Sequence, residues 1–162
     1  MFGQSLEMII AGRRNMHYIR VRCPACAVQN QISDIKQHLK PRCGKCGESL
    51  DTRDFVVPVE LGDTTLDTFL QSTKLPVLVD FFSPTCGPCA ALAPLLDNMT
   101  RQFLGRLVVA KVDTGKNPGC AAHFHIHGVP TLIFFKNGKE IEQLVGLPDK
   151  NHLQAKMEYY AL

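Results

Sequence analysis

The sequence contains no tryptophan, no internal repeat and no long apolar segment, and these absences exclude whole classes of protein. A membrane-spanning helix needs about 20 consecutive apolar residues, and no run in the 162 residues approaches that length. Wholesale disorder is excluded as well, because 45% of the residues are hydrophobic and 20% are charged. We therefore expect either one ordinary folded domain, or one domain of about 100 residues with a small addition.

Acidic residues are scarce in the first third of the chain. Residues 1–50 hold 8 Lys and Arg against 3 Asp and Glu, whereas residues 51–162 carry a net charge of −2. This asymmetry suggests two units with separate roles. The basic segment also has few apolar residues, so it cannot form a stable hydrophobic core without an additional cross-link. We predict an N-terminal tail, a small domain, a linker and a main domain, which span residues 1–16, 17–50, 51–54 and 55–162 respectively.

The cysteine count is odd, at seven, which argues against the fully paired disulfide framework of a secreted protein. The first residues do not have the pattern of a secretion signal, because the short apolar stretch Met8-Ile9-Ile10-Ala11 precedes the arginines instead of following them. We therefore expect a cytoplasmic protein in a reducing compartment, where clustered cysteines hold a metal or carry out redox chemistry.

Four of the cysteines form two Cys-x-x-Cys pairs that are separated by sixteen residues. Each pair directs two sulfur atoms at one point, and two pairs complete a tetrahedron of thiolates around a zinc ion. Two disulfides or four unrelated thiols are the alternatives. A four-thiolate site has no open coordination position, so we expect one structural Zn²⁺ that contributes folding free energy to the segment. The predicted ligands are Cys23, Cys26, Cys43 and Cys46.

The motif Cys86-Gly87-Pro88-Cys89 lies in a different setting, between a predicted buried strand and the start of a helix. At a helix start, unpaired N–H groups and the helix dipole favour a thiolate on Cys86. Cys89 lies one turn inside the helix, close enough to attack a mixed disulfide formed at Cys86. A lone pair could be half of a metal site, but no second pair is left to complete it. A Cys-x-x-Cys in a βαβ context indicates dithiol redox chemistry.

Two more positions bear on this chemistry. Asp80 is an acid inside the apolar run at residues 77–82. It is either a helix cap or buried ion-pair partner, or a carboxyl of raised pKa that takes the proton from Cys89. Pro130, in the segment Val129-Pro130-Thr131, suits a cis peptide bond beside the active site.

The remaining pattern predicts an α/β layer fold that ends in an antiparallel hairpin. Asn137-Gly138 between two apolar segments is a strong signal of the hairpin turn. The expected order of elements is βαβαβαββα. Strands are predicted at residues 56–59, 77–82, 107–112, 131–135 and 141–145, and helices from a capping box at Thr64-Thr65-Leu66-Asp67, from Cys86 to Phe103 with a kink at Pro94, at residues 117–124 and at residues 149–160.

Together, these motifs resemble the thioredoxin family over residues 55–162. With the four cysteines ahead of them, the chain is similar to the zinc-containing bacterial thioredoxins over nearly all but its first sixteen residues. The motif Cys-Gly-Pro-Cys, followed later by a cis-proline, is highly specific for the family. The other residues that carry the resemblance are Asp80, Lys111, residues 128–131, residues 134–138 and Gly146.

The resemblance implies a thioredoxin fold, with a mixed central sheet flanked by helices, preceded by a small four-cysteine zinc ribbon. It implies that Cys86 is the nucleophile and Cys89 the resolving thiol, with a redox-active disulfide between them and no organic cofactor. It also implies a buried acid–base pair of Asp80 with Lys111. Pro130 would be cis and would line the substrate groove, and the other expected substrate-binding residues are Gly87, Pro88, Val129 and Gly146.

Some positions depart from the family pattern or remain open. Thr85 stands where the family carries tryptophan before the first cysteine, which removes a large flat face from the substrate platform. His123, His125 and His127 would hold a metal in an extended segment, but at a helix end and the following turn they would diverge. Cys120 is either a partly buried small apolar residue or a regulatory oxidation site.

The expected activity is the reduction of protein disulfides in the cytoplasm. The resemblance implies thioredoxin reductase as electron donor and disulfide-containing proteins as clients, and we expect a monomer. Proline between the two cysteines favours a reducing redox potential of about −270 mV for the dithiol/disulfide pair. A zinc- and redox-controlled binding module or holdase, and a more oxidising isomerase of the same fold, are the alternatives. The basic segment has no aromatic platform and no dense Lys/Arg stripe, so we expect no nucleic-acid partner, and no membrane partner.

Overall fold

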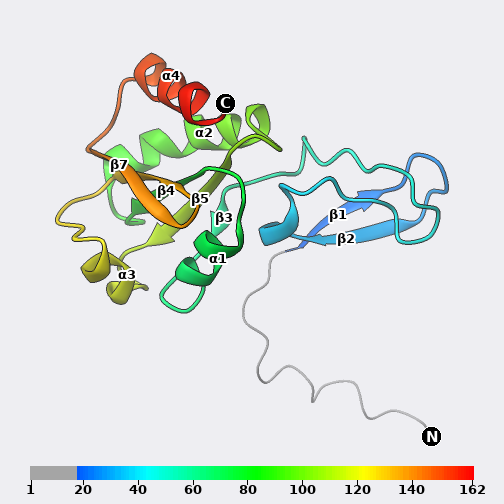
Figure 1. The fold of residues 1–162 in the computed structure, drawn as a ribbon, viewed down its shortest axis with the longest axis horizontal. Coiled ribbons are helices and arrows are strands. Elements are labelled where there is room, and N and C mark those ends of the chain that lie inside the picture. The colour runs from blue at the N-terminus through cyan, green and yellow to red at the C-terminus, as the bar shows by residue number, and fades with distance from the viewer. Residues whose placement is uncertain (1–17) are drawn as a thin grey trace, which may run out of the picture.

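The apolar run at residues 77–82 forms strand β4, the central strand of a five-stranded sheet. The computed structural model describes residues 18–162 and orders this sheet β3-β5-β4-β6-β7. β4 pairs in parallel with β5 and antiparallel with β6, so the sheet is mixed (Figure 1). Its strands and helices are β3 (Val59–Glu60), α1 (Leu66–Ser72), β4 (Val77–Phe82), α2 (Gly87–Gln102), β5 (Val108–Asp113), α3 (Pro118–His123), β6 (Thr131–Lys136), β7 (Lys139–Val145) and α4 (Lys150–Tyr160).

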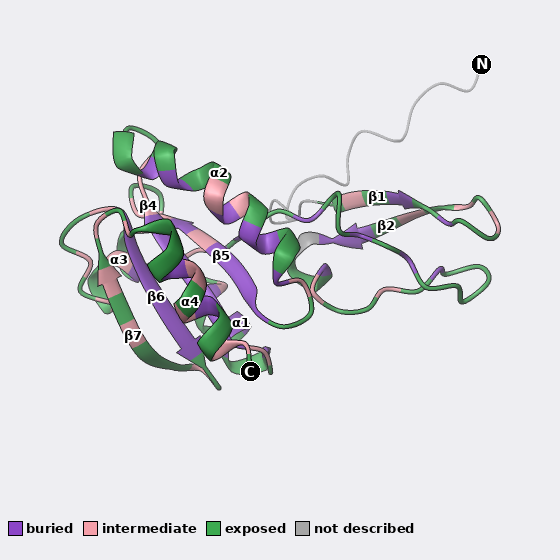
Figure 2. Ribbon diagram, turned by 90° about the horizontal axis from the view of Figure 1, so that it is seen from above, coloured by how far each residue is buried: buried purple, intermediate pink, exposed green. Residues whose placement is uncertain are grey.

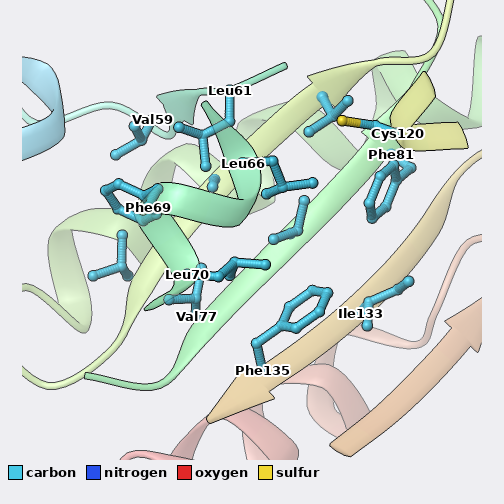
Figure 3. Close-up of a cluster of buried hydrophobic side chains, with 14 residues drawn as sticks. Val59, Leu61, Leu66, Phe69, Leu70, Val77, Phe81, Cys120, Ile133 and Phe135 are labelled. Atoms are coloured by element: carbon cyan, nitrogen blue, oxygen red, sulfur yellow. The ribbon is translucent and has the colours of Figure 1, made fainter. Parts of the chain in front are cut away.

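Helices cover both faces of this sheet and bury β4 from each side. Because successive residues of a strand point to opposite faces, Val77, Val79 and Phe81 pack with α1 and α3 in one cluster (Figure 3). Leu78 packs with α2 and α4 in a second cluster. Figure 2 shows that β6 is buried whereas the edge strand β7 is largely exposed. No helix within residues 18–162 is both long and apolar enough to cross a membrane.

Residues 18–50 form a smaller lobe beside the α/β body (Figure 1). In this lobe, β1 (Tyr18–Arg22) and β2 (Gln29–Ser33) form an antiparallel pair, followed by the 3-10 helix η1 (Asp34–Lys36). The predicted tail, residues 1–16, lies outside the described residues. The buried apolar cluster of the lobe is small and includes two of the cysteines: Val21, Cys23, Ile32, Cys43 and Leu50.

One side chain of the lobe joins it to the edge of the main sheet. Gln37 is buried, and its amide bonds to both backbone groups of Val57. The Val57 N–H donates to Oε1 at 3.2 Å, and Nε2 donates to the Val57 carbonyl. The predicted linker at residues 51–54 is also part of the folded structure, because Thr52 is buried and its carbonyl accepts hydrogen bonds from two N–H groups further along the chain.

Two local expectations are wrong. The strand predicted at residues 56–59 is shortened and shifted to Val59–Glu60, because Pro58 has no N–H and the backbone of Val57 is bonded to the lobe. The capping box before α1 does not form. The Thr65 hydroxyl instead accepts a hydrogen bond from the N–H of Gly62 at 3.0 Å and makes no bond to the first turn of the helix.

A carboxylate from a distant part of the chain caps α3. The residue that precedes this helix makes no side-chain cap bond, and Asp63 accepts hydrogen bonds from the N–H groups of Gly119 at 3.2 Å and Cys120 at 2.6 Å. These bonds, of which that from Cys120 is the stronger, lower the pKa of Asp63. Glycine is required at position 119, since a Cβ there would lie 2.9 Å from the carboxyl carbon of Asp63.

Glu142 of β7 holds the C-terminal helix against the sheet. The Lys156 ammonium lies 2.5 Å from Oε1, and the Tyr160 hydroxyl donates to Oε2 at 2.8 Å. These bonds, chiefly that of Lys156, lower the pKa of Glu142, and the carboxylate raises the pKa of Tyr160 to about 12. The carboxylate therefore connects β7 to two positions near the end of α4.

We predict that Glu142→Gln lowers the free energy of unfolding by about 1 kcal/mol at pH 7, because two charge-assisted bonds at a partly exposed site weaken. Since the folded protein holds this group ionised, the difference from the unaltered protein should shrink as the pH falls below about 4.3, the ordinary pKa of glutamate. Urea unfolding at several pH values measures both effects. Glu158→Gln on the exposed side of α4 is the matched control, and an equal loss in that variant would contradict the prediction.

Candidate functional site

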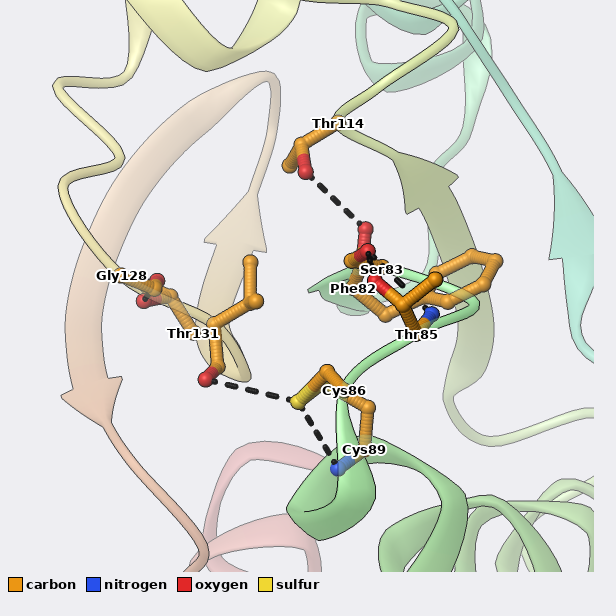
Figure 4. The surroundings of a disulfide bond; sticks show 9 residues. Phe82, Ser83, Thr85, Cys86, Cys89, Thr114, Gly128 and Thr131 are labelled. Carbon is orange, nitrogen blue, oxygen red and sulfur yellow. Dashed lines mark hydrogen bonds between the residues drawn. A yellow bond between two sulfur atoms is a disulfide. The ribbon is translucent and has the colours of Figure 1, made fainter.

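The motif Cys86-Gly87-Pro88-Cys89 lies at the N-terminus of α2, where the chain leaves the central strand (Figure 4). Cys86 is the N-cap residue and is joined to Cys89 by a disulfide, with 5.2 Å between the two Cα atoms. The N–H of Cys89 donates to the Cys86 sulfur at 3.2 Å. Cys89 is buried while Cys86 is half-buried, so only the first cysteine is open to a large substrate.

The loop before β6 lies directly against the disulfide. The Cys86 sulfur is 3.6 Å from the carbonyl oxygen of Val129, and the Val129–Pro130 peptide bond is cis. This loop is fastened on both sides: the Thr131 hydroxyl donates to the Gly128 carbonyl at 2.7 Å, and the Gly146 N–H donates to the Pro130 carbonyl at 2.8 Å. The turn after β7 is thereby brought to the same place as the motif.

The segment before the motif is small and polar. The hydroxyls of Ser83 and Thr85 lie 3.1 Å apart, and Thr85 is exposed beside Cys86 (Figure 4). The Phe82 carbonyl accepts a hydrogen bond from the Thr114 hydroxyl at 3.1 Å, which ties the end of β4 to the loop after β5. No aromatic ring covers the motif at position 85, and the chain on this side of Cys86 presents two hydroxyl groups.

Asp80 lies in the core beneath the motif. It occupies the same sheet face as Leu78, the face covered by α2 and α4, and only 5% of its surface is exposed. Its Oδ1 is buried without a hydrogen-bond partner. Burial raises the pKa of Asp80 to about 7, and the positive charge of Lys111 only partly opposes this rise. Of the predicted alternatives, a helix cap, a buried ion-pair partner or a carboxyl of raised pKa, the unpartnered and buried Oδ1 favours the last.

Lys111, which the resemblance pairs with Asp80, is the register neighbour of Asp80 on β5, but its ion pair is with another residue. Its ammonium lies 3.0 Å from the Glu60 carboxylate of β3 and 5.9 Å from the centre of the Phe82 ring. Asp80 and Lys111 therefore lie side by side without closing an ion pair. The sequence shows Glu60 only as an acid near a predicted edge strand, and nothing in it reveals the register with Lys111.

The second site is in the lobe, where the four predicted ligands converge. The sulfur atoms of Cys23, Cys26, Cys43 and Cys46 lie within 4.8 Å of one another. The closest pairs join the two motifs: Cys23 to Cys46 at 3.5 Å and Cys26 to Cys43 at 3.6 Å. Tetrahedral zinc with bonds of about 2.3 Å separates its sulfur ligands by about 3.8 Å. The four thiols are thus a donor set that fits a tetrahedral metal ion.

The two cysteine turns of the lobe have the same backbone form. In each, the N–H of the residue after the second cysteine bonds to the carbonyl of the first, Ala27 to Cys23 at 3.0 Å and Gly47 to Cys43 at 2.9 Å. Ala27 and Gly47 both have positive φ, 60° and 76°. Sequence reasoning missed Asn30, whose amide accepts from the Gly44 N–H at 3.0 Å and lies 3.7 Å from the Cys43 sulfur.

The other residues singled out in the sequence are not part of either site. His123, His125 and His127 are all exposed, and within residues 18–162 only the four lobe cysteines form a group that could hold a metal. Cys120 is buried behind α1, and burial, together with its bond to the Asp63 carboxylate, raises the pKa of its thiol to about 12. A thiol with such a high pKa contributes to core packing and is a poor nucleophile.

Comparison with known proteins agrees with this geometry. The sequence profile of the family Thioredoxin matches residues 57–159. "Thioredoxin M-type, chloroplastic" of Spinacia oleracea is 36% identical over 101 residues, which are 62% of this chain and 56% of that protein. "Thioredoxin" of Synechocystis sp. is 37% identical over 101 residues, 62% of this chain and 94% of that protein. The match thus spans little more than half of the spinach relative and nearly all of the cyanobacterial one.

A solved structure shows the same likeness in three dimensions. A mutant thioredoxin from Halobacterium salinarum has a TM-score of 0.60 and 34% identity, and the match covers 65% of this chain and 92% of that one. Thioredoxin homologues are protein-disulfide reductases with a redox-active disulfide. The family profile, the relatives and the fold agree, and the chain belongs to the thioredoxin family.

Proposed function

We propose that this protein is a protein-disulfide reductase of the zinc-containing thioredoxin 2 type, with Cys86 as nucleophile and Cys89 as resolving thiol. The observation that carries the proposal is the Cys86–Cys89 disulfide at the N-terminus of α2, beside the Val129 carbonyl. The thioredoxin relatives support the same activity.

The reaction begins with the reduced dithiol. The Cys86 thiolate, stabilised by the Cys89 N–H and the helix N-terminus, attacks one sulfur of a client disulfide and displaces the other as a thiolate. Cys89 then gives its proton to Asp80 and attacks the Cys86 sulfur of the mixed disulfide. The second client thiolate leaves, and two electrons have passed from the enzyme dithiol to the client.

The groove around Cys86 would hold an extended client segment. Gly87 and Pro88 are exposed on one side of the sulfur, while Val129, cis-Pro130 and Gly146 form the other side. The resulting disulfide, Cys86–Cys89, must be reduced again before the next cycle. Thioredoxin reductase is the proposed electron donor, as the family implies, and disulfide-containing proteins are the proposed clients.

The lobe at residues 17–50 is proposed to be a structural zinc ribbon. The four thiols fit tetrahedral coordination, and the small apolar cluster around them leaves the metal as the main source of folding free energy. We propose that residues 51–54 connect this ribbon to a thioredoxin domain at residues 55–162, and that the protein works as a cytoplasmic monomer. The unpaired lobe thiols support a reducing compartment.

The first test is reduction of insulin disulfides by dithiothreitol or by a reductase. Cys86→Ser should lower turnover to below about 1%, because the variant lacks the nucleophile at the helix N-terminus and Cys89 is buried. Cys89→Ser should accumulate mixed disulfides that mass spectrometry detects. Cys120→Ser is the matched control and should keep full activity, since that thiol is buried away from the motif. Full activity of Cys86→Ser would overturn the proposal, and a redox potential well above about −200 mV would favour the isomerase alternative.

The second test concerns Asp80. If its carboxylate accepts the proton of Cys89, the rate of mixed-disulfide resolution should rise about tenfold between pH 6 and pH 8, following a pKa of about 7. Asp80→Asn should lose this rise, which stopped-flow fluorescence of a labelled client can measure. An unchanged pH profile in the variant would contradict the role of Asp80.

Stability separates this effect from misfolding. Because the pKa of Asp80 is raised in the folded protein, the folded state keeps this proton at pH values where the unfolded state has lost it. The free energy of unfolding of the unaltered protein therefore falls as the pH rises from about 4 to 7. At pH 8, Asp80→Asn should therefore be more stable, by roughly 2–4 kcal/mol. A slower reaction in a more stable protein would come from the chemistry and not from unfolding.

The third test concerns the metal. The unaltered protein should contain about one zinc per chain, and Cys43→Ser should lose nearly all of it, because a buried thiolate ligand is removed. Elemental analysis of the purified proteins gives the content, and Cys120→Ser should retain the metal. A stoichiometric zinc content in Cys43→Ser would show that the four-cysteine site is not the binding site.

A further inference from the structure

Three charged side chains lie in one row across three adjacent strands of the body. Glu60 on β3 is paired in register with Lys111 on β5, and Lys111 is paired in register with Asp80 on β4. Parallel strands are spaced about 4.8 Å apart, and residues in register point to the same face. The Lys111 side chain therefore has a carboxyl group on each side.

The ammonium of Lys111 binds only one of them. It lies 3.0 Å from Glu60, whereas Oδ1 of Asp80 has no partner. The side chains of Lys111 and Glu60 are 34% and 55% exposed, while Asp80 is 5% exposed. An ammonium pairs with the carboxylate that is still hydrated at a smaller desolvation cost than with a buried one.

We propose that Glu60 is a positioning residue for the acid–base chemistry of the redox site, because by binding the Lys111 ammonium it keeps this cation from pairing with Asp80. The inference rests on the proposed function, in which Asp80 accepts the proton of Cys89. A carboxylate that closed an ion pair with Lys111 would remain ionised well below neutral pH and would be a weak base. By binding Lys111, Glu60 thus keeps the Asp80 carboxylate basic enough to accept the proton of Cys89.

The surroundings of Asp80 leave few other charges to play this part. Its register partner on the opposite strand β6 is Leu132, which is uncharged. The side chains of α2 and α4 that pack in the buried cluster on this face of the sheet are apolar: Leu92, Leu96, Met99, Leu153 and Met157. Among the residues that the structure describes, Lys111 is the charged group that alters the pKa of Asp80. Removing the Glu60 carboxylate should lower the pKa of Asp80 for two reasons. It frees the Lys111 ammonium to pair with Asp80, and it removes a nearby negative charge.

The test is a pH titration of the Asp80 carboxyl in the full-length oxidised protein, followed by ¹³C NMR with Asp80→Asn to assign the signal. Glu60→Gln should lower the midpoint by roughly half a pH unit or more, and Lys111→Gln should raise it. Asp51→Asn is the matched control, because it removes one negative charge from another exposed ion pair and should leave the midpoint unchanged.

The outcomes distinguish this inference from the proposed function. A midpoint in Glu60→Gln that is unchanged or higher would overturn the role of Glu60, whatever the protein catalyses. Where Asp80→Asn abolishes the pH dependence of mixed-disulfide resolution, the profile of Glu60→Gln should move downward by the same amount as the NMR midpoint, and a profile that stays in place would overturn the role of Glu60. If Asp80→Asn itself retains the normal profile, the proton-acceptor step of the proposed function fails. The NMR titration would still measure the effect of Glu60 on the pKa of Asp80.

Discussion

Burial of strand β4 on both faces is the constraint on which the rest of this structure depends. Its residues Val77 to Phe81 are all buried, and the helices that bury them have to pack on opposite sides of the sheet. Where the apolar run ends, the chain leaves the sheet and begins α2, so the motif is placed at the carboxyl end of a central strand. The same alternation carries Asp80 into the core, and the desolvation that raises its pKa follows from the fold itself.

The cysteines of one chain acquire different chemistry from their surroundings. Within the four-cysteine site, backbone hydrogen bonds, first that of Cys46, lower the pKa of the Cys43 thiol to about 6. Against the opposing backbone bond at Glu48, hydrogen bonds with the neighbouring thiols, first that of Cys26, raise the pKa of Cys46 to about 12. At Cys120, burial raises the pKa to about 12 and leaves an inert thiol. Cys86 is more exposed than Cys43 or Cys120 and has a helix N-terminus beside it. Exposure and the helix N-terminus thus set Cys86 apart from the buried Cys120, whereas the candidate ligands are set apart by their spacing and convergence.

The parts that the sequence predicted well are those set by local chemistry. Apolar periodicity located β4 and α2, and the spacing of Cys23, Cys26, Cys43 and Cys46 anticipated their convergence. What it did not predict depends on neighbours far along the chain. The strand expected at residues 56–59 gave way to a bond with Gln37, and the ion pair of Lys111 with Glu60 follows from the β3–β5 register. These contacts depend on which strands are neighbours in the sheet, and the residues near each position in the sequence do not indicate that order.

Strand β3 is the element that both parts of the molecule share. The ladder between β3 and β5 has only two register pairs, so the bonds of Gln37 to Val57 supply much of the restraint on this edge. Three residues later, Glu60 binds the ammonium of Lys111, the register neighbour of Asp80. The lobe that holds the four thiols therefore bonds to the same chain segment that supplies the partner of Lys111. Coupling between two sites needs a physical element that both contact, and the segment from Val57 to Glu60 is such an element, because Val57 bonds to Gln37 of the lobe and Glu60 bonds to Lys111 of the body.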